Sequence, residues 1–188
     1  MAKRITFVSP VGVAVFPHIT TKDTEGTYAT NKYTTRLELA PKDFAKVKAQ
    51  LKAIAAEFEW DGIKNPKLPI KADKDGNECQ IYAKSNFLPL VIDAKKHPLF
   101  DPRNPPSLDR LKQLAVRGGS KIKIGCNVFQ YDKGISLQLE TVQVIERAGG
   151  ASLEGFDEEE GYDAFNEAES EGFGEEGGEA GSDEDYDL

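Results

Sequence analysis

The sequence has few of the residues on which metal sites and disulfide frameworks depend. Of its 188 residues, two are cysteine and two are histidine. Cys79 and Cys126 have no metal-ligand spacing to each other or to His18 and His97. Because both cysteines lie in apolar strand patterns, we interpret them as reduced core thiols, which suits a cytoplasmic location. The sequence predicts no metal site and no cofactor.

Long apolar runs and catalytic signatures are also missing. No stretch approaches about 18 consecutive apolar residues, so no membrane span is expected. The opening MAKRITFVSP lacks the uninterrupted apolar region of a signal peptide. The sequence contains no phosphate-binding lysine loop, dinucleotide glycine pattern, nucleophile elbow or zinc-protease motif. Asp73–Glu78 lacks the ligand spacing of a calcium loop, so we expect a polar turn there. These absences predict a protein that is not an enzyme.

Positive charge is missing from the last part of the chain. The net charge is −8, yet all 24 lysines and arginines lie at or before Arg147. Half of the 32 acidic residues lie in 149–188, so residues 1–148 carry +8 and the remainder carries −16. A basic body joined to an acidic arm is typical of proteins that bind nucleic acid.

Alternating apolar residues predict a chain built mainly of strands. The expected strands are 4–16, 31–39, 78–84, 87–92, 121–131 and 135–145, with a bend at Pro10–Gly12 and a bulge near Glu140. Apolar residues at helical spacing, from Phe44 to Phe58, predict one long helix over 41–60 that begins at Pro41. A shorter helix is expected over 107–116, capped by Ser107.

This order of elements predicts a mainly β fold with one or two helices, an OB-fold-like, partly open barrel over residues 1–148. The usual helix of such a barrel falls between its third and fourth strands, so the 41–60 helix would be an insertion. Residues 149–188 have almost no apolar periodicity and are expected to form a disordered acidic tail.

The strand at 121–133 carries the most specific functional signal. Its odd positions place cations and aromatic rings on one face: Lys121, Lys123, Phe129, Tyr131 and Lys133. Single-stranded nucleic acid needs this combination, because cations neutralise phosphates while each base stacked on a ring contributes about 1–3 kcal/mol. The alternative is that Phe129 and Tyr131 pack beneath a loop or against the long helix.

Two other strands repeat the pattern more weakly. Tyr82 and Lys84 share the expected outer face of one strand, and Lys32 and Arg36 share that of another. We therefore include these four residues in the predicted DNA-binding surface. Tyr33 and Trp60 are interpreted as structural, although contact with DNA stays open for both.

The acidic tail is expected to compete with nucleic acid. A tethered polyanion reaches the basic body at high effective concentration and opposes the counterion release that drives DNA binding. Its isolated aromatic residues, in an acidic background, suggest a segment that binds partner proteins. The predicted partner-binding segment is Asp183, Glu184, Asp185, Tyr186, Asp187 and Leu188. The alternative is a solubilising arm without a specific role.

Taken together, the chain resembles the single-stranded DNA-binding proteins of tailed bacteriophages. The resemblance rests on Ile5-Thr6-Phe7-Val8-Ser9-Pro10, the Lys32-Tyr33 strand, the 121–134 hairpin and the acidic tail, and it covers essentially the whole chain. It implies an OB-fold that binds single strands without sequence preference in phage DNA replication, recombination and repair. It also implies a host cytoplasmic location and a tail that contacts polymerase and helicase–primase. Family members often end in an aromatic residue, whereas this chain ends in Leu188, two residues after Tyr186.

A different class of function stays open beside this one. A non-catalytic protein-interaction or chaperone-type factor would act through the tail and use the barrel as a scaffold. Exposure of Phe129 and Tyr131 would favour DNA binding, and their burial would favour the scaffold. A carboxylate-metal nuclease would need clustered acids, whereas those of the body are scattered. The oligomeric state is also left open.

Overall fold

The computed structural model describes residues 5–149. Residues 1–4 and 150–188 lie outside the described part, so the predicted disordered tail and its partner-binding segment, 183–188, are not described. The elements, in chain order, are β1 (Ile5–Val8), β2 (Gly12–His18), β3 (Tyr33–Glu38), α1 (Pro41–Ala56), β4 (Ile70–Ala72), β5 (Glu78–Ser85), β6 (Leu90–Ile92), α2 (Leu108–Gln113), β7 (Lys121–Tyr131) and β8 (Gly134–Glu146).

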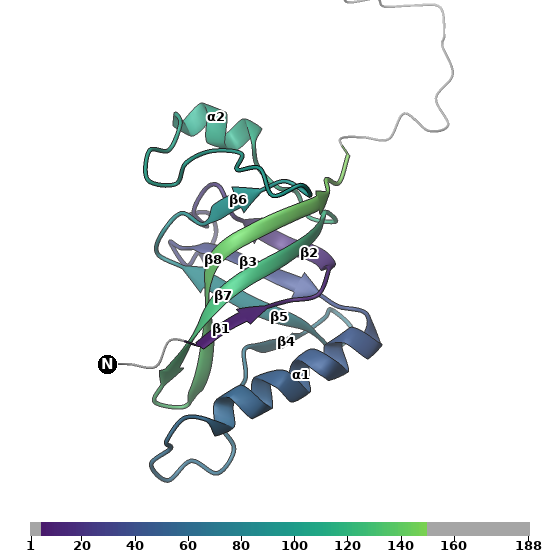
Figure 1. Ribbon diagram of the computed structural model, residues 1–188, viewed down its shortest axis with the longest axis vertical. Coiled ribbons are helices and arrows are strands. Elements are labelled where there is room, and N and C mark those ends of the chain that lie inside the picture. Colours follow the sequence, from purple (N-terminus) through teal and green to yellow (C-terminus); the bar gives the residue numbers. More distant parts are fainter. Residues whose placement is uncertain (1–4, 150–188) are drawn as a thin grey trace, which may run out of the picture. The chain divides into compact units, whose positions relative to one another are not determined.

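Five strands form a closed ring, which confirms the predicted OB-like barrel. The order around the ring is β2, β3, β5, β8 and β7, and a short pairing of Gly12 with Ile122 and Val13 with Lys121 closes it. β5 and β8 run parallel, whereas the other neighbours in the ring are antiparallel. β1 extends the sheet beside β7, β6 pairs with β8, and β4 pairs with β5 (Figure 1).

The first strand bends where the sequence predicted a bend. Residues 9–11 separate β1 from β2, and the Ser9 hydroxyl accepts a hydrogen bond from the Ile124 amide at 2.9 Å. A Cβ on Gly12 would lie 2.6 Å from the Glu38 carbonyl oxygen, so this crossing admits only glycine. Further along β2 the register shifts between Val15 and His18. The bend at residues 9–11 therefore divides one stretch of chain into two strands: β1, which pairs with β7, and β2, which pairs with β3 and β7.

The β7–β8 hairpin is the longest pairing in the fold. Its register runs from Lys121 opposite Glu146 to Tyr131 opposite Gly134. Gly125 lies opposite Thr141 and Cys126 lies opposite Leu139, which leaves Glu140 as the extra residue. The bulge predicted near Glu140 is thereby confirmed, and it explains why the apolar parity of β8 shifts at that point.

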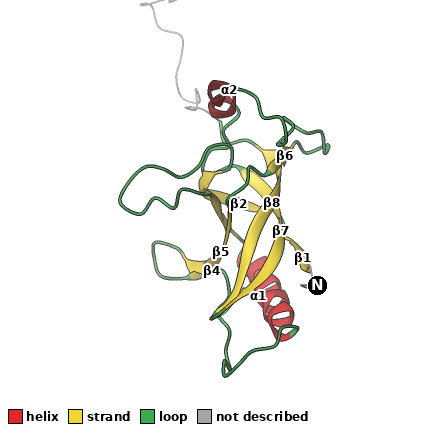
Figure 2. Cartoon of the chain, turned by 90° about the vertical axis from the view of Figure 1, so that its left-hand side faces the viewer, coloured by secondary structure: helices red, strands yellow, loops and turns green. Residues whose placement is uncertain are grey.

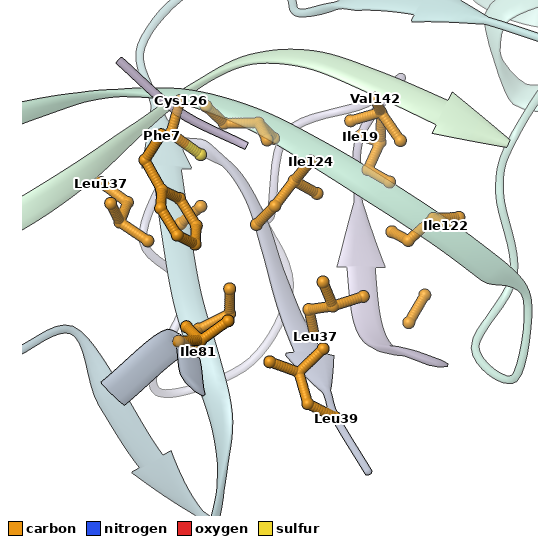
Figure 3. Packing of buried hydrophobic residues seen from close by; sticks show 14 of the residues in the cluster. Phe7, Ile19, Leu37, Leu39, Ile81, Ile122, Ile124, Cys126, Leu137 and Val142 are labelled. Carbon is orange, nitrogen blue, oxygen red and sulfur yellow. The ribbon is translucent and has the colours of Figure 1, made fainter. Parts of the chain in front are cut away.

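The core fills the inside of the barrel and extends beneath α1. Side chains of Phe7, Ile81 and Ile124, from three different strands, converge in the interior (Figure 3). α1 lies between β3 and β5 in sequence, so it is the predicted insertion. It buries the expected stripe: Phe44, Val47, Leu51, Ile54 and Ala55. α1 and α2 occupy opposite ends of the barrel (Figure 1).

α1 ends at Ala56, earlier than the predicted end at Trp60. Just beyond it, the Glu57 and Phe58 amides donate to the Ile54 and Ala55 carbonyl oxygens, three residues back, at 3.1 and 3.3 Å. The Trp60 indole nitrogen donates to the Ala55 carbonyl oxygen at 2.7 Å, and its ring meets Phe58 edge to face at 6.2 Å. These contacts support the structural interpretation of Trp60.

The segment between β5 and β7 departs from the sequence prediction in two places. Phe87 is 72% exposed and the strand begins only at Leu90, so 87–89 is not part of the core strand. Ser107 caps α2 as predicted, accepting from the Arg110 amide, but Leu108 is exposed and only Leu111 is buried. Leu114, which follows the helix, is partly buried and packs against the core, and α2 itself spans only six residues (Figure 2).

The cysteines are free, as predicted. Cys126 is buried and Cys79 is partly buried, and burial is the main cause that raises the pKa of each thiol. Neither α1 nor α2, the two helices in residues 5–149, has the length and hydropathy needed to cross a bilayer.

Candidate nucleic-acid interface

Three neighbouring hollows on the barrel share lining residues with one another. The first, of about 390 Å³, lies between β3, β5 and the loop over residues 19–32. The second, of about 570 Å³, lies between the 67–71 segment, β5 and β8, and the third, of about 440 Å³, between β2 and the β4–β5 turn. Tyr82 and Lys71 line both the first and the second, whereas Phe16 and Arg36 line both the first and the third. We call this surface the barrel groove.

Tyr82 lies where the first two hollows meet. Its direct cross-strand neighbour is Arg36, and the Lys71 ammonium lies 5.7 Å from the centre of its ring. Burial raises the pKa of Tyr82, with a smaller contribution from the Asp23 carboxylate, while the Arg36 guanidinium lowers it. The phenol therefore stays neutral well above physiological pH. A neutral ring flanked by cations suits stacking with a base whose phosphates lie nearby.

The second hollow is the most basic part of the groove. Lys67, Lys71 and Lys84 line it together with Tyr82 and Tyr131, and no acidic side chain is among its lining residues. Tyr131 is 44% exposed. The structure thus brings together three residues of the predicted surface, Tyr82, Lys84 and Tyr131, although Tyr131 on β7 lies 47 residues after Lys84 on β5.

Phe16 is a groove residue that the sequence analysis missed. Its side chain is 71% exposed, and the Arg36 guanidinium lies 5.8 Å from the centre of its ring. Its φ of 46° is strained for a residue with a side chain, and it falls in the register shift of β2. The sequence does carry a signal at this position. The alternation of apolar residues ends at Val15, and Phe16 then stands directly before Pro17.

Lys71 was missed for a different reason. It lies in β4, a strand of three residues that is too short for an alternating pattern to reveal. Only its pairing with β5 places Lys71 over Tyr82. Nothing in the sequence around residue 71 indicates that contact.

Lys121 and Lys123 lie apart from the groove, towards the other end of β7. The Lys121 ammonium contacts the Glu146 carboxylate at 2.6 Å. Lys123 lines a separate hollow of about 320 Å³ with Val8 and Thr141. At about 3.3 Å per residue, the eight steps from Lys123 to Tyr131 separate them by about 26 Å. The structure therefore does not unite the odd positions of this strand in one patch, and DNA contact at both lysines stays a prediction.

The remaining predicted residues surround the groove. Phe129 is 46% exposed opposite Ser136, and Lys133 is exposed in the hairpin turn, so the alternative of a buried Phe129 and Tyr131 is not what the structure shows. Lys32 is half-buried at the base of the 19–32 loop, where its carbonyl accepts from the Asp23 amide at 2.9 Å. Tyr33 is half-buried, with the Lys22 ammonium 5.8 Å from its ring centre.

Acidic residues line the other two hollows. Asp23 and Glu25 line the first, and Glu38, Asp73 and Asp75 line the third. Asp73 shapes a polar turn, as predicted: one carboxylate oxygen accepts from the amides of Asp75 and Asn77, both at 2.9 Å. The hydrogen bond from the Asn77 amide is the main cause that lowers the pKa of Asp73. Within residues 5–149, no group of three histidine, cysteine or carboxylate side chains is arranged to hold a metal ion.

Comparisons with known proteins identify the fold. No known family model matches the sequence, and no curated protein matches it. The crystal structure of gp2.5, a single-stranded DNA-binding protein encoded by bacteriophage T7, matches with a TM-score of 0.56 at 18% identity, over 85% of this chain and 99% of that one. The single-stranded DNA-binding protein of bacteriophage Enc34 matches with a TM-score of 0.57 at 17% identity, over 81% of this chain and 87% of that one. Its complex with single-stranded DNA gives 0.58 at 14% identity, over 78% and 89%. The chain therefore has the fold of these phage single-stranded DNA-binding proteins, as the resemblance in its sequence predicted.

Proposed function

We propose that this protein binds single-stranded DNA in the barrel groove, without sequence preference and without catalysing a reaction. The observation that carries the proposal is the second hollow, where two tyrosine rings and three lysines surround one open surface. Rings supply stacking surfaces and ammonium groups neutralise phosphates, which are the two needs of an unpaired strand. The fold shared with phage proteins that bind single-stranded DNA supports the same conclusion.

The chemistry of the groove explains the expected selectivity. Every base has a π face, so stacking on Tyr82 and Tyr131 tolerates any sequence. A duplex hides those faces within its stack, so it can use only the lysines. We therefore expect single strands to bind more tightly than duplex DNA of the same sequence.

We further propose that the protein acts in phage DNA replication, recombination and repair, in the host cytoplasm. The tail would leave the groove when DNA binds and then recruit replication proteins, such as polymerase and helicase–primase, through residues 183–188. The charge of −16 on residues 149–188 against +8 on residues 1–148 supports the competition step. The resemblance supports the choice of partners.

Fluorescence anisotropy tests this proposal. A labelled oligothymidylate is titrated with the full chain and with a chain ending at Ala148, at two salt concentrations, with duplex DNA as the comparison. We expect salt-sensitive binding of the single strand, weaker binding of the duplex, and tighter binding by the shortened chain. A shortened chain that is folded yet binds no single strand at low salt would refute the proposal. The protein-interaction factor acting through the acidic tail would then be favoured.

A further inference from the structure

We propose that residues 63–69, which we call the strap, form a wall of the barrel groove that holds phosphates of the bound strand, and that Gly134 is the residue that lets the strap take this position. This inference rests on the proposed function. It concerns the use of Lys67, which precedes β4 and has no place in the sequence pattern that predicts the binding surface. The ligand is the phosphodiester backbone of a single strand.

The strap is tied to both of its neighbours by main-chain hydrogen bonds. The Lys67 amide donates to the Lys133 carbonyl oxygen at 2.8 Å, and the Ile135 amide donates to the Lys67 carbonyl oxygen at 3.0 Å. Two residues later the Pro69 carbonyl oxygen accepts from the Tyr82 amide at 2.9 Å. The strap thus bridges the hairpin turn and β5, the two places that carry the groove tyrosines. Its backbone is fixed on both sides of the second hollow.

Gly134 allows the closest of these approaches. A Cβ at this position would lie 2.1 Å from the Lys67 carbonyl oxygen and 2.6 Å from its amide nitrogen. Both are backbone atoms, so a side chain at 134 cannot be accommodated by a rotamer change. Any substitution must move the strap away from the hairpin. By contrast, a Cβ on Gly125, in the same strand pair, would meet Thr141 at 3.5 Å, which is an ordinary contact.

The charges indicate what the strap contacts. Lys67 is exposed and lines the second hollow with Lys71 and Lys84, whereas carboxylates line the first and third hollows. Arg36, Lys71 and Lys74 offset those carboxylates, so the second hollow, which has no acidic lining residue, attracts phosphates most strongly. The strap therefore brings Lys67 to the hollow that Lys84 also lines, with the exposed turn residue Lys133 next to it. This arrangement neutralises a phosphodiester backbone that passes through the second hollow.

The salt dependence of binding measures this contact, because a single-strand phosphate contact contributes about 0.7 to the slope of log affinity against log salt. The full chain and its Lys67→Ala, Gly134→Ala and Gly125→Ala variants are titrated with a labelled oligothymidylate over a range of salt. We expect Lys67→Ala to reduce the magnitude of the slope by about 0.7. If the variant and the unaltered chain bind equally near 1 M salt, the variant then binds about fivefold more weakly near 0.1 M. Gly134→Ala should lower the slope by at least as much, and Gly125→Ala should leave it unchanged.

A double variant separates positioning from a general loss of stability. If Gly134 acts by placing Lys67, adding Lys67→Ala to Gly134→Ala lowers the slope no further, and Lys67→Arg in the unaltered background keeps the full slope. Thermal unfolding identifies the folded variants. If Gly134→Ala does not fold, the slopes of Lys67→Ala and Lys67→Arg decide the role of the strap.

Two results would overturn the inference in different ways. Normal binding with an unaltered slope in folded Lys67→Ala would overturn the strap alone. Absence of single-strand binding by the unaltered chain would overturn the proposed function and the strap with it.

Discussion

Tyr82→Ala is the substitution that tests the stacking surface most sharply. Tyr82 joins the first and second hollows, its cross-strand neighbour is Arg36, and the Lys71 ammonium lies 5.7 Å from its ring centre. Removal of the ring leaves the lysines and the barrel in place, since Tyr82 is only half-buried on the outer face of β5. The loss is therefore that of one stacked base.

The size of the effect follows from the stacking energy. A loss of about 1–3 kcal/mol per base weakens single-strand binding by about 5-fold to 150-fold. Tyr82→Phe keeps the ring and should stay close to the unaltered affinity. The salt slope of Tyr82→Ala should also stay close to normal, because stacking releases no counterions.

The assay is anisotropy with a labelled oligothymidylate, accompanied by thermal unfolding. Phe87→Ala is the matched control, since this ring is 72% exposed and lies outside the lining of the three groove hollows. We expect it to leave affinity unchanged. A folded Tyr82→Ala that binds as tightly as the Phe87→Ala control would refute the stacking role.

Three further predictions concern the groove end, the barrel seam and the thiols. Phe16→Ala should weaken single-strand binding with little loss of stability, because its ring is exposed; an unchanged affinity would remove Phe16 from the groove. Gly12→Ala should destabilise the fold by about 3 kcal/mol in urea unfolding, whereas Gly118→Ala should have little effect, because its Cβ would meet nothing within 3.8 Å. Equal stabilities would contradict the tight crossing at Gly12. Cys126 should resist a thiol reagent in the native protein at about pH 8–9, because burial raises its thiol pKa and keeps it protonated, while the partly buried Cys79 reacts slowly. Rapid modification of both thiols before unfolding would show that the barrel opens at β7.

Sequence patterns predicted the parts of the fold that depend on periodicity. The α1 stripe, the β7 alternation and the bulge at Glu140 are local, because each is written in consecutive residues. Weak predictions coincide with short elements. β4 has three residues and α2 has six, so neither spans two full periods of its pattern.

The binding surface could be predicted only in part, because strand parity does not determine which residues meet around a barrel. Tyr131 and Lys123 are both at odd positions of β7, yet Tyr131 joins the groove while Lys123 lines another hollow. The partners of Tyr131 come from β5 and from the strap, and the pairing of distant strands decides that arrangement. The strained Phe16 illustrates the same limit, since a bulge turns it out of the pattern of β2.

The measurement that tests the central claim most directly is chemical-shift mapping of the isotope-labelled full chain with an oligothymidylate of about ten nucleotides. The account predicts shifts at Arg36, Lys71, Tyr82, Lys84 and Tyr131, with the outer side of α1 unaffected. Shifts confined to the Lys123 hollow, or no shifts on adding single-stranded DNA at low salt, would contradict it.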